Sequence, residues 1–471
     1  MIKLYNTLSG KKEPLVPVYE GQIGIYACGP TVYDYFHIGN ARVFITIDVL
    51  RRYLSYRGYK VTFVQNYTDI DDKMIEKAKQ MDITVNRLAD RFIDHYLEDA
   101  ASLGILPADY QPRATDHIPQ IIALIEKLVG KGMAYEVEGD VYFDVQSFPS
   151  YGRLSGQDLS ELSAGARVEV DKRKRHPIDF VLWKKEKPGE PSWESPWGRG
   201  RPGWHIECSA MSMHYLGDTL DIHAGGQDLI FPHHENEIAQ SEGATGKTFT
   251  KYWTHVGYLN INEEKMSKSL GNVLTVQQLR QEGDPLALRF FMLSAHYRSP
   301  INFTVEYLEQ TSKALERLSS LVYNIRERIA KAEDGILDNE EEVLMQKINS
   351  SKDKFIQSMD DDFNTAEAIG SLFELARDAN VYLNRSEGQK VEVLERILHF
   401  YQETDKILGY LQDTSPLTLD EEIEELINRR EEARRQKDWV VADEIRDRLK
   451  EGGIILEDTP QGVRWKRERK S

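Results

Sequence analysis

Short apolar runs alternate with a longer apolar-periodic stretch near the start of the chain. Residues 23–27 (Ile-Gly-Ile-Tyr-Ala) are typical of a buried strand, residues 39–56 repeat apolar positions with a helical period, and residues 61–64 (Val-Thr-Phe-Val) predict another strand. A strand, a helix and a strand in this order form a βαβ unit, which implies a parallel, doubly wound sheet. The pattern predicts a second region of this kind near residues 221–223 and 258–261.

The pattern changes between these two regions and again after them. The segment between them contains hairpin-like pieces such as residues 140–144, and residues 188–202, rich in Pro, Gly and Trp, are typical of loop. Residues 304–411 are helical in pattern, and the tail offers two charged helices and two short strands. We therefore expect an α/β protein with a nucleotide-binding domain whose two halves, residues 1–119 and 203–262, are separated by an insertion at 120–202. A lysine-loop region (263–303), a helical bundle (304–413) and a small α/β domain (414–471) would follow.

Composition narrows the class of protein. The 471 residues are 40% hydrophobic and 29% charged, as in an ordinary globular enzyme, and no apolar run approaches the roughly 20 residues of a membrane span. The start has no signal-peptide pattern, so we expect a cytoplasmic protein without a membrane partner. The net charge of −17 argues against nonspecific coating of nucleic acid but leaves a local RNA-binding patch open. Two cysteines exclude a disulfide framework.

Two motifs suit the handling of a triphosphate. His37-Ile38-Gly39-Asn40 falls where the first predicted strand hands over to its helix, and backbone N–H groups at a helix start favour phosphate. Gly39 allows a close approach of the ligand, while His37 and Asn40 can donate hydrogen bonds. Lys265-Met266-Ser267-Lys268-Ser269 adds two flexible cations, Lys265 and Lys268, that can follow shifting phosphate charge. The alternatives are a capping turn and a solvated basic loop.

Cysteine, histidine and glutamate form a candidate metal set. Cys28 follows the first predicted strand, where α/β sheets bind ligands, and Cys208 lies in Gly203-Trp204-His205-Ile206-Glu207-Cys208. If Pro232 opens a helix, His233 and Glu237 fall at i and i+4 on one face. Thiolate, imidazole and carboxylate are zinc ligands, but the spacing matches no compact zinc finger. Two core cysteines and a solvated helix face remain the alternative.

Several stretches, in this order along the chain, resemble the cysteinyl-tRNA synthetases of the bacterial type. The two phosphate motifs resemble the paired signatures of class I aminoacyl-tRNA synthetases. The other matching stretches cover essentially the whole chain and are residues 26–34 (YACGPTVYD), 68–73 (TDIDDK), 203–208 (GWHIEC), 225–228 (GGQD), 231–237 (FPHHENE) and 359–365 (MDDDFNT). One departure is visible, since the first signature usually ends in His and here ends in Asn40, which is still a donor.

The resemblance implies a site and a reaction. It implies one zinc ion per chain that binds the substrate thiol and is held by Cys28, Cys208, His233 and Glu237. The amino-acid pocket would be lined by Cys28, Thr68, Trp204 and Asp228, with Gly225 and Gly226 near the ribose and His223 a neighbour. ATP, with Mg²⁺, would be attacked at its α-phosphate by the carboxylate of L-cysteine. A carboxylate is ionised at pH 7, so catalysis by His37, Asn40, Lys265 and Lys268 is positioning and charge stabilisation.

The chemistry of discrimination supports a metal. A pocket that judges size alone separates similar side chains by only about 1–3 kcal/mol, whereas a thiolate bonds zinc far better than a hydroxyl does. With three anionic ligands the zinc is expected to recognise the thiol and not to activate water.

The resemblance also implies a tRNA(Cys) partner and a monomer. Residues 263–303 would contact the acceptor arm, and the tail would read the anticodon through Arg434, Trp439, Asp443 and Asp458. A charged helix with a core Trp is the alternative for the tail. Two other functions stay open: a related ligase that joins activated cysteine to an amino-sugar, and a catalytically silent RNA-binding relative.

Overall fold

A four-stranded parallel sheet lies at the centre of the larger part of the chain. Its strand order is β10-β9-β3-β4, with bounds Thr250–Val256, Leu220–Gly226, Gln22–Ala27 and Lys60–Gln65. Ile25 pairs with Phe63 of β4 and Ile222 of β9. The chain leaves β3 toward β4 on one side and later returns to the other side through β9, so the strand order reverses between β3 and β9. Ligands of such sheets bind at the carboxyl ends of the strands at this switch point.

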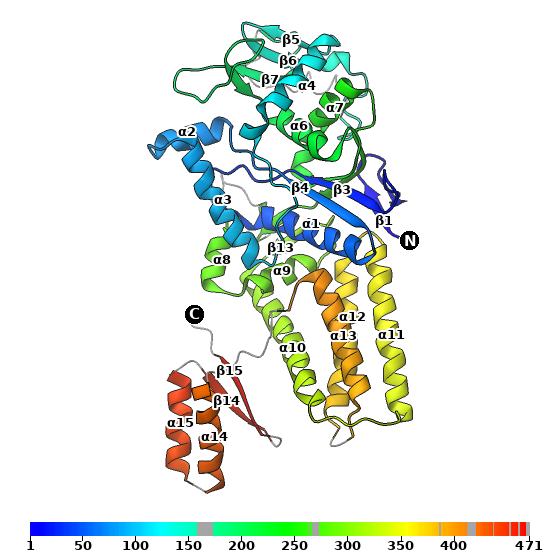
Figure 1. Ribbon diagram of the computed structural model, residues 1–471, viewed down its shortest axis with the longest axis vertical. Helices are drawn as coiled ribbons and strands as arrows, with labels where there is room; N and C mark the ends of the chain where they lie inside the picture. Colours follow the sequence, from blue (N-terminus) through cyan, green and yellow to red (C-terminus); the bar gives the residue numbers. More distant parts are fainter. Residues whose placement is uncertain are drawn as a thin grey trace. The chain divides into compact units, whose positions relative to one another are not determined.

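The computed structural model describes residues 1–157, 173–262, 264–265, 273–385, 388–411, 421–436, 438–451, 454–459 and 462–467. The chain divides into two units, Met1–Tyr410 and Leu411–Ser471. Figure 1 shows the elements of each unit.

The first predicted βαβ unit is confirmed, and the second is wrong in one strand. Helix α1 (Ile38–Tyr56) connects β3 to β4, close to the predicted limits. Residues 258–261 do not join the parallel sheet: β10 takes that place, and β11 (Leu259–Ile261) belongs to a small sheet of order β12-β11-β13. The strands β12 and β13 are Glu264–Lys265 and Ile301–Phe303. The polar residues of β10 hide it from an apolar-run criterion.

An antiparallel sheet follows the first βαβ unit. Its order is β5-β6-β7-β8, with bounds Ala134–Val137, Asp140–Phe143, Phe180–Lys185 and Gly200–Pro202. Around the two sheets lie the helices α2 (Asp72–Gln80), α3 (Val85–Ser102), α4 (Ile118–Gly130), α6 (Trp204–Leu216) and α7 (Glu235–Thr245). A hairpin of β1 (Lys3–Asn6) and β2 (Lys11–Pro14), which the apolar pattern does not predict, begins the chain.

Helices make up the rest of the first unit. They are α8 (Val276–Glu282), α9 (Pro285–Leu293), α10 (Val305–Ile329), α11 (Asn339–Asp360), α12 (Thr365–Leu383) and α13 (Val391–Leu408). Figure 1 shows the last four side by side in yellow-green to orange. Their buried stripes recur at helical spacing, as in Leu318, Val322 and Ile325 of α10.

The second unit is a small α/β structure, as predicted for the tail. Helices α14 (Glu421–Arg435) and α15 (Trp439–Glu451) precede an antiparallel pair of β14 (Ile454–Thr459) and β15 (Gly462–Arg467). Ile445 and Leu449 form its small core with Leu426, Ile427, Val441 and Leu456. The residues between α15 and β14, 452–453, lie outside the described residues.

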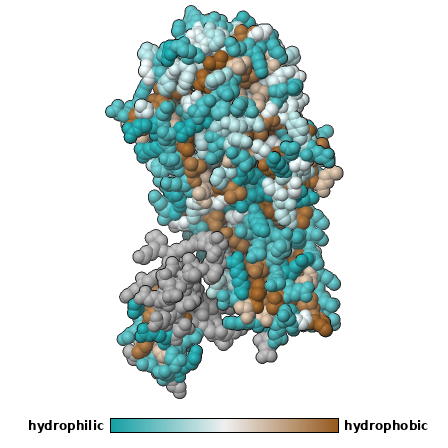
Figure 2. Space-filling view, viewed as in Figure 1, coloured by the Kyte–Doolittle hydropathy of each residue, from teal (hydrophilic) through white to brown (hydrophobic). Residues whose placement is uncertain are grey.

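The surface agrees with the ordinary composition. The face drawn in Figure 2 is largely hydrophilic, with hydrophobic residues scattered among the polar ones. Among the described helices, none combines the length and apolar character that crossing a membrane requires.

Candidate functional site

His37, the first residue of the first phosphate motif, caps the N-terminus of α1. Its backbone is extended (φ −100°, ψ 158°), and its Nδ1 accepts a hydrogen bond of 3.2 Å from the backbone N–H of Asn40. Gly39 and Asn40 lie in the first turn of α1, at the carboxyl end of β3. The helix start therefore faces the edge at which a parallel sheet binds ligands.

The segment that follows the second motif pairs with the turn that carries the first. Lys265 ends β12, which pairs with β11 through Asn260, and Lys268 lies outside the described residues. Beyond the loop, the backbone N–H of Ile38 donates to Leu274 O at 3.0 Å, and that of Val276 donates to Phe36 O at 2.8 Å. The segment that follows the lysine loop is thus paired directly with the His37 turn.

The four residues of the predicted metal set come together at the switch point. Cys28 follows β3, Cys208 lies in α6, His233 lies in the short helical turn Ile230–His234 before α7, and Glu237 lies in α7. All four are buried, and one ligand atom from each lies within 4.8 Å of the others. The two Sγ atoms are 3.7 Å apart, Cys28 Sγ is 3.5 Å from Glu237 Oε1, and that oxygen is 3.0 Å from His233 Nε2.

Electrostatics in the cluster calls for a cation among anionic donors. A hydrogen bond from Cys28 lowers the pKa of the Cys208 thiol to about 6, while burial raises the pKa of Cys28 itself. Burial disfavours the charged form of Glu237, but His223 and His233 outweigh it and lower the pKa of Glu237 to about 2. Burial likewise opposes charge on His233, yet Glu237 and Cys208 raise its pKa to about 10. The proton on His233 therefore balances the negative charge of Glu237 and Cys208. A metal ion bound to these groups can balance the same charge.

The donor set suits a metal in its outer contacts as well. His233 Nε2 is buried and makes no hydrogen bond of good geometry, while its Nδ1 lies 2.9 Å from His205 Nδ1. Glu237 Oε2 is held by His223 Nε2 at 2.8 Å, which leaves Oε1 directed at the cluster. Ligands whose second atom is fixed by a neighbour are the usual arrangement of a metal site.

A second, overlapping group shares two of these residues. Cys28, His223, His234 and Glu237 also bring four ligand atoms within 4.8 Å of one another. His234 Nδ1 lies 2.8 Å from His255 Nε2, and burial lowers the pKa of His234 well below its usual value. His223 already bonds Glu237, so a metal ion in the second group would have to replace that hydrogen bond. We therefore favour the first group.

The predicted pocket residues follow strands or begin a helix at the carboxyl edge of the parallel sheet. Thr68 is buried and its backbone N–H donates to Pro30 O, next to the Cys28 loop. Trp204 is 40% exposed, and its ring centroid lies 4.2 Å from that of His233. Asp228 is exposed just after β9, at the same edge of the sheet. The prediction thus named residues that gather around one edge.

Gly225 and Gly226 end β9 close to neighbouring side chains. A Cβ on Gly225 would lie 2.7 Å from His234 Cε1, and one on Gly226 would lie 2.3 Å from Asp228 Oδ1. Gly225 therefore requires glycine because the buried ring of His234 blocks a side chain there, whereas at Gly226 the exposed Asp228 carboxylate can move aside.

Sequence reasoning missed the histidines behind the ligands. His205, His234 and His255 each contact the cluster or a residue that does. Two of them were visible as neighbours of predicted ligands, His205 near Cys208 and His234 beside His233. His255 lies on β10, the strand that the pattern missed.

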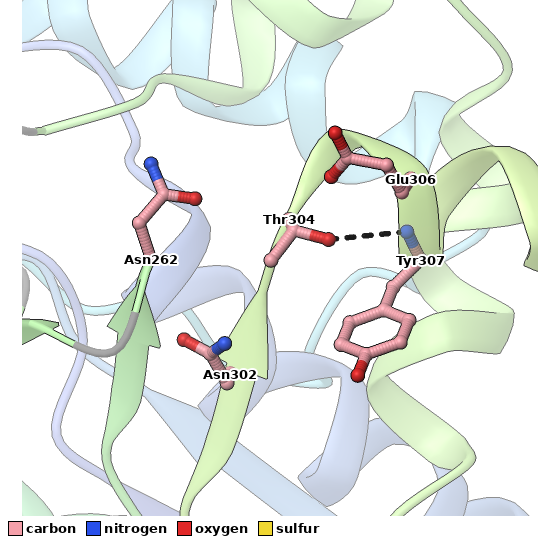
Figure 3. A pocket seen from close by; sticks show the side chains of 5 residues that line it. All are labelled: Asn262, Asn302, Thr304, Glu306 and Tyr307. Atoms are coloured by element: carbon pink, nitrogen blue, oxygen red, sulfur yellow. Dashed lines mark hydrogen bonds between the residues drawn. The ribbon is translucent and has the colours of Figure 1, made fainter.

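A polar pocket of about 460 Å³ adjoins the small sheet that carries Lys265. Figure 3 shows Asn262 after β11, Asn302 on β13, and Thr304 accepting a hydrogen bond of 3.2 Å from the Tyr307 N–H at the start of α10. Glu306 completes the lining. The pocket offers donors and acceptors beside the lysine loop.

The residues predicted to face tRNA lie in the second unit. Arg434 is in α14, while Trp439 and Asp443 are in α15. Trp439 is 58% exposed, so the alternative of a core Trp is wrong. Asp458 lies in β14, and its side chain is outside what the structure describes.

The fold is that of class I aminoacyl-tRNA synthetases. Residues 14–313 match the family described as "tRNA synthetases class I (C) catalytic domain". The fold is similar to that of the Mycobacterium tuberculosis methionyl-tRNA synthetase in complex with methionyl-adenylate (16% identity, TM-score 0.61, 82% of this chain and 89% of that one). It is also similar to LeuRS in its ternary complex with tRNA and LeuAMS from Agrobacterium radiobacter K84 (12% identity, TM-score 0.62, 84% of this chain and 85% of that one). At these identities the likeness shows the fold.

The rest of the chain narrows the family. Residues 354–412 match the DALR domain, and residues 418–465 match the "Cysteinyl-tRNA ligase anticodon binding domain". The chain belongs to the cysteinyl-tRNA synthetase family, and it is a tRNA ligase whose domains support aminoacylation of tRNA(Cys). The resemblance drawn from the sequence motifs is thereby confirmed.

Proposed function

We propose that the enzyme activates L-cysteine with ATP to form cysteinyl-adenylate and transfers the cysteine to tRNA(Cys), with a zinc ion recognising the substrate thiol. The observation that carries this proposal is the buried group of Cys28, Cys208, His233 and Glu237, four zinc-ligand types at the switch point of the sheet. Bound there, zinc would supply a soft Lewis acid that bonds a thiolate far better than a hydroxyl.

The chain's own residues have simple tasks in this reaction. The start of α1, with His37, Gly39 and Asn40, would hold phosphate oxygens of ATP and its Mg²⁺, and Lys265 and Lys268 would neutralise charge that develops there. Thr68, Trp204 and Asp228 would position the amino acid, with Gly225 and Gly226 leaving room for the ribose. Positioning of an already ionised carboxylate requires no general base.

Transfer to tRNA would use the later parts of the chain. We assign residues 263–303 to the acceptor arm and residues 304–413 to the body of the tRNA. The exposed ring of Trp439 supports base stacking, with Arg434, Asp443 and Asp458 as donors and acceptors to base edges. An amino-sugar ligase has no use for the anticodon-binding domain matched at residues 418–465. The enzyme is expected to act as a monomer.

The test combines metal analysis with amino-acid-dependent ATP–pyrophosphate exchange. The purified enzyme should carry one zinc per chain and exchange pyrophosphate with cysteine far faster than with serine. Cys208→Ser should lower the zinc content and reduce the preference for cysteine to about 10–200-fold or less, the range that a pocket judging size and shape reaches. Ser212→Ala, one turn further along α6 and also buried, is the matched control and should leave the preference intact. An unchanged preference in Cys208→Ser, or exchange with serine in place of cysteine, would refute the proposal.

A further inference from the structure

Arg42 is a buried arginine in α1, five residues after His37. It is 1% exposed, and among the described residues no carboxylate acts on its pKa. Burial lowers its pKa to about 10, which leaves it charged at pH 7. Its partners are backbone carbonyls: Nη1 donates to Gly257 O at 2.8 Å and to Tyr258 O at 2.7 Å, and Nη2 donates to His296 O at 3.3 Å and to Ser299 O.

These four carbonyls lie at the base of the small sheet. Residues 257–258 lead from β10 into β11, and residues 296–299 lead into β13. β11 pairs with β13 in parallel, from Leu259 with Ile301 onward, and it pairs with β12, which ends in Lys265. The guanidinium therefore joins the two segments from which the lysine-bearing sheet grows.

The packing of this joint is tight. Gly257 N–H donates to Tyr297 O at 2.8 Å, and a Cβ on Gly257 would lie 2.6 Å from Arg298 O and 2.8 Å from Ser299 O. Contacts under about 3 Å to backbone leave no room for a side chain, so glycine is required for the two segments to meet. This packing fixes how residues 257–258 and 296–299 meet, and the guanidinium of Arg42 lies between them.

The far end of the lysine loop is attached to the same helix by other means. There, backbone hydrogen bonds pair Leu274 and Val276 with Ile38 and Phe36. The loop thus leaves from a base held by Arg42 and returns to a strand segment held beside His37. The segments on both sides of the second phosphate motif are therefore connected to α1, one through Arg42 and the other beside His37.

We propose that Arg42 is a positioning residue for the reaction, fixing the small sheet that carries Lys265 relative to the helix start at His37. Only a planar guanidinium with two Nη atoms can bond two pairs of carbonyls at once, because lysine carries a single ammonium on a flexible stem. The inference rests on the proposed roles of His37 and Lys265 in binding ATP.

Arg42→Lys keeps the charge and removes the fork. A misplacement of about 1 Å between catalytic groups costs about 100-fold in rate, so we expect kcat of cysteine-dependent pyrophosphate exchange to fall by about that factor. The KM for cysteine and the zinc content should stay within about twofold of the wild type, because the metal cluster lies on other elements. A general loss of folding would move all three quantities together.

Arg289→Lys is the matched control. Arg289 is also fully buried, also bonds α1 through Asp48, and also donates to backbone carbonyls, those of Leu103 and Leu408, but it does not touch the small sheet. It should lower the thermal midpoint as much as Arg42→Lys does and leave kcat within a few-fold of wild type. Equal kcat losses in the two variants, or no kcat loss in Arg42→Lys, would overturn the inference.

A second change tests the same joint without touching a charge. Gly257→Ala forces the two segments apart and should reproduce the fall in kcat with an unchanged KM for cysteine. If Arg42→Lys does not fold, this variant decides: normal kcat in a folded Gly257→Ala enzyme would refute the inference. A wild-type enzyme that shows no cysteine-dependent exchange would refute the proposed function instead, so the two failures are distinct.

Discussion

The contact between His205 and His233 predicts how tightly the proposed metal site would hold zinc. His205 Nδ1 lies 2.9 Å from His233 Nδ1, and burial lowers the pKa of His205 well below its usual value, so this ring is neutral at pH 7. It therefore offers an acceptor that fixes the orientation of His233 and leaves Nε2 directed at Glu237. His205→Ala removes that partner and leaves Nδ1 of a buried ring unsatisfied.

The size of the effect follows from the lost hydrogen bond. Leaving a buried polar group without its partner costs about 1–3 kcal/mol, and each 1.4 kcal/mol is about tenfold in affinity, so zinc should bind about 5–150-fold more weakly. This agrees with the roughly 10–100-fold found when outer partners of metal ligands are removed. Asn places a polar atom where Nδ1 was, so His205→Asn should recover most of the affinity.

Competition for zinc with a chelator of known affinity measures the change. His214→Ala is the control, since His214 lies in the same helix and packs on His117 and Tyr215, not on the cluster. If His205→Ala binds zinc as tightly as the wild type, or if His214→Ala lowers the zinc affinity equally, then His205 does not orient His233 as a metal ligand.

Three further predictions concern stability and tRNA. Asp48→Asn should lower the free energy of unfolding by about 3–5 kcal/mol in urea titration, because it strips a buried arginine, Arg289, of its carboxylate 2.7 Å away. Burial raises the pKa of Asp99 to about 6, so its ionisation opposes folding as pH rises from about 4 to 6. Asp99→Asn should therefore add on the order of 1 kcal/mol at pH 7, after allowance for water access, and nothing at pH 4, in paired thermal melts. Trp439→Ala should reduce cysteinylation of tRNA by about 5–150-fold through loss of about 1–3 kcal/mol of stacking, with pyrophosphate exchange unchanged.

The sequence pattern predicts the part of the fold that rests on local chemistry. The apolar run of β3, the periodicity of α1 and the donor types of the metal set are all readable in short stretches. β10 is not, because Thr250, Thr254 and His255 interrupt its apolar residues. His255 is acceptable in a buried strand because the N-terminal segment covers it: Thr7 N–H donates to Trp253 O, and His255 Nδ1 lies 2.7 Å from Thr7 Oγ1. A contact across so many residues leaves no local signal.

The same limit applied to the acidic stretch near residue 360, which matched the family but had no assigned chemistry. The structure makes Asp362 a buried junction: it accepts from Tyr5 N–H, Tyr297 Oη and Arg298 Nε, each at 2.7 Å. Its φ of +67° is one that Asp tolerates better than most residues. Because Asp362 binds residues 297–298, and Arg42 binds the carbonyls on either side of them, one chain of contacts runs from the helical bundle to α1.

That chain of contacts explains why motifs far apart in sequence need one another. Arg42 of α1 and the Asp362 junction both bind the segment 296–299, which leads into the small sheet, so these contacts connect α1, that sheet and the helical bundle. The zinc-ligand cluster, by contrast, hangs on β3, α6 and α7 and does not use that segment. If the cluster recognises the amino acid and the His37 turn and Lys265 place ATP, as proposed, these two tasks rest on separable sets of contacts. Substitutions in the cluster should change amino-acid specificity, and substitutions among the contacts of residues 296–299 should change the rate.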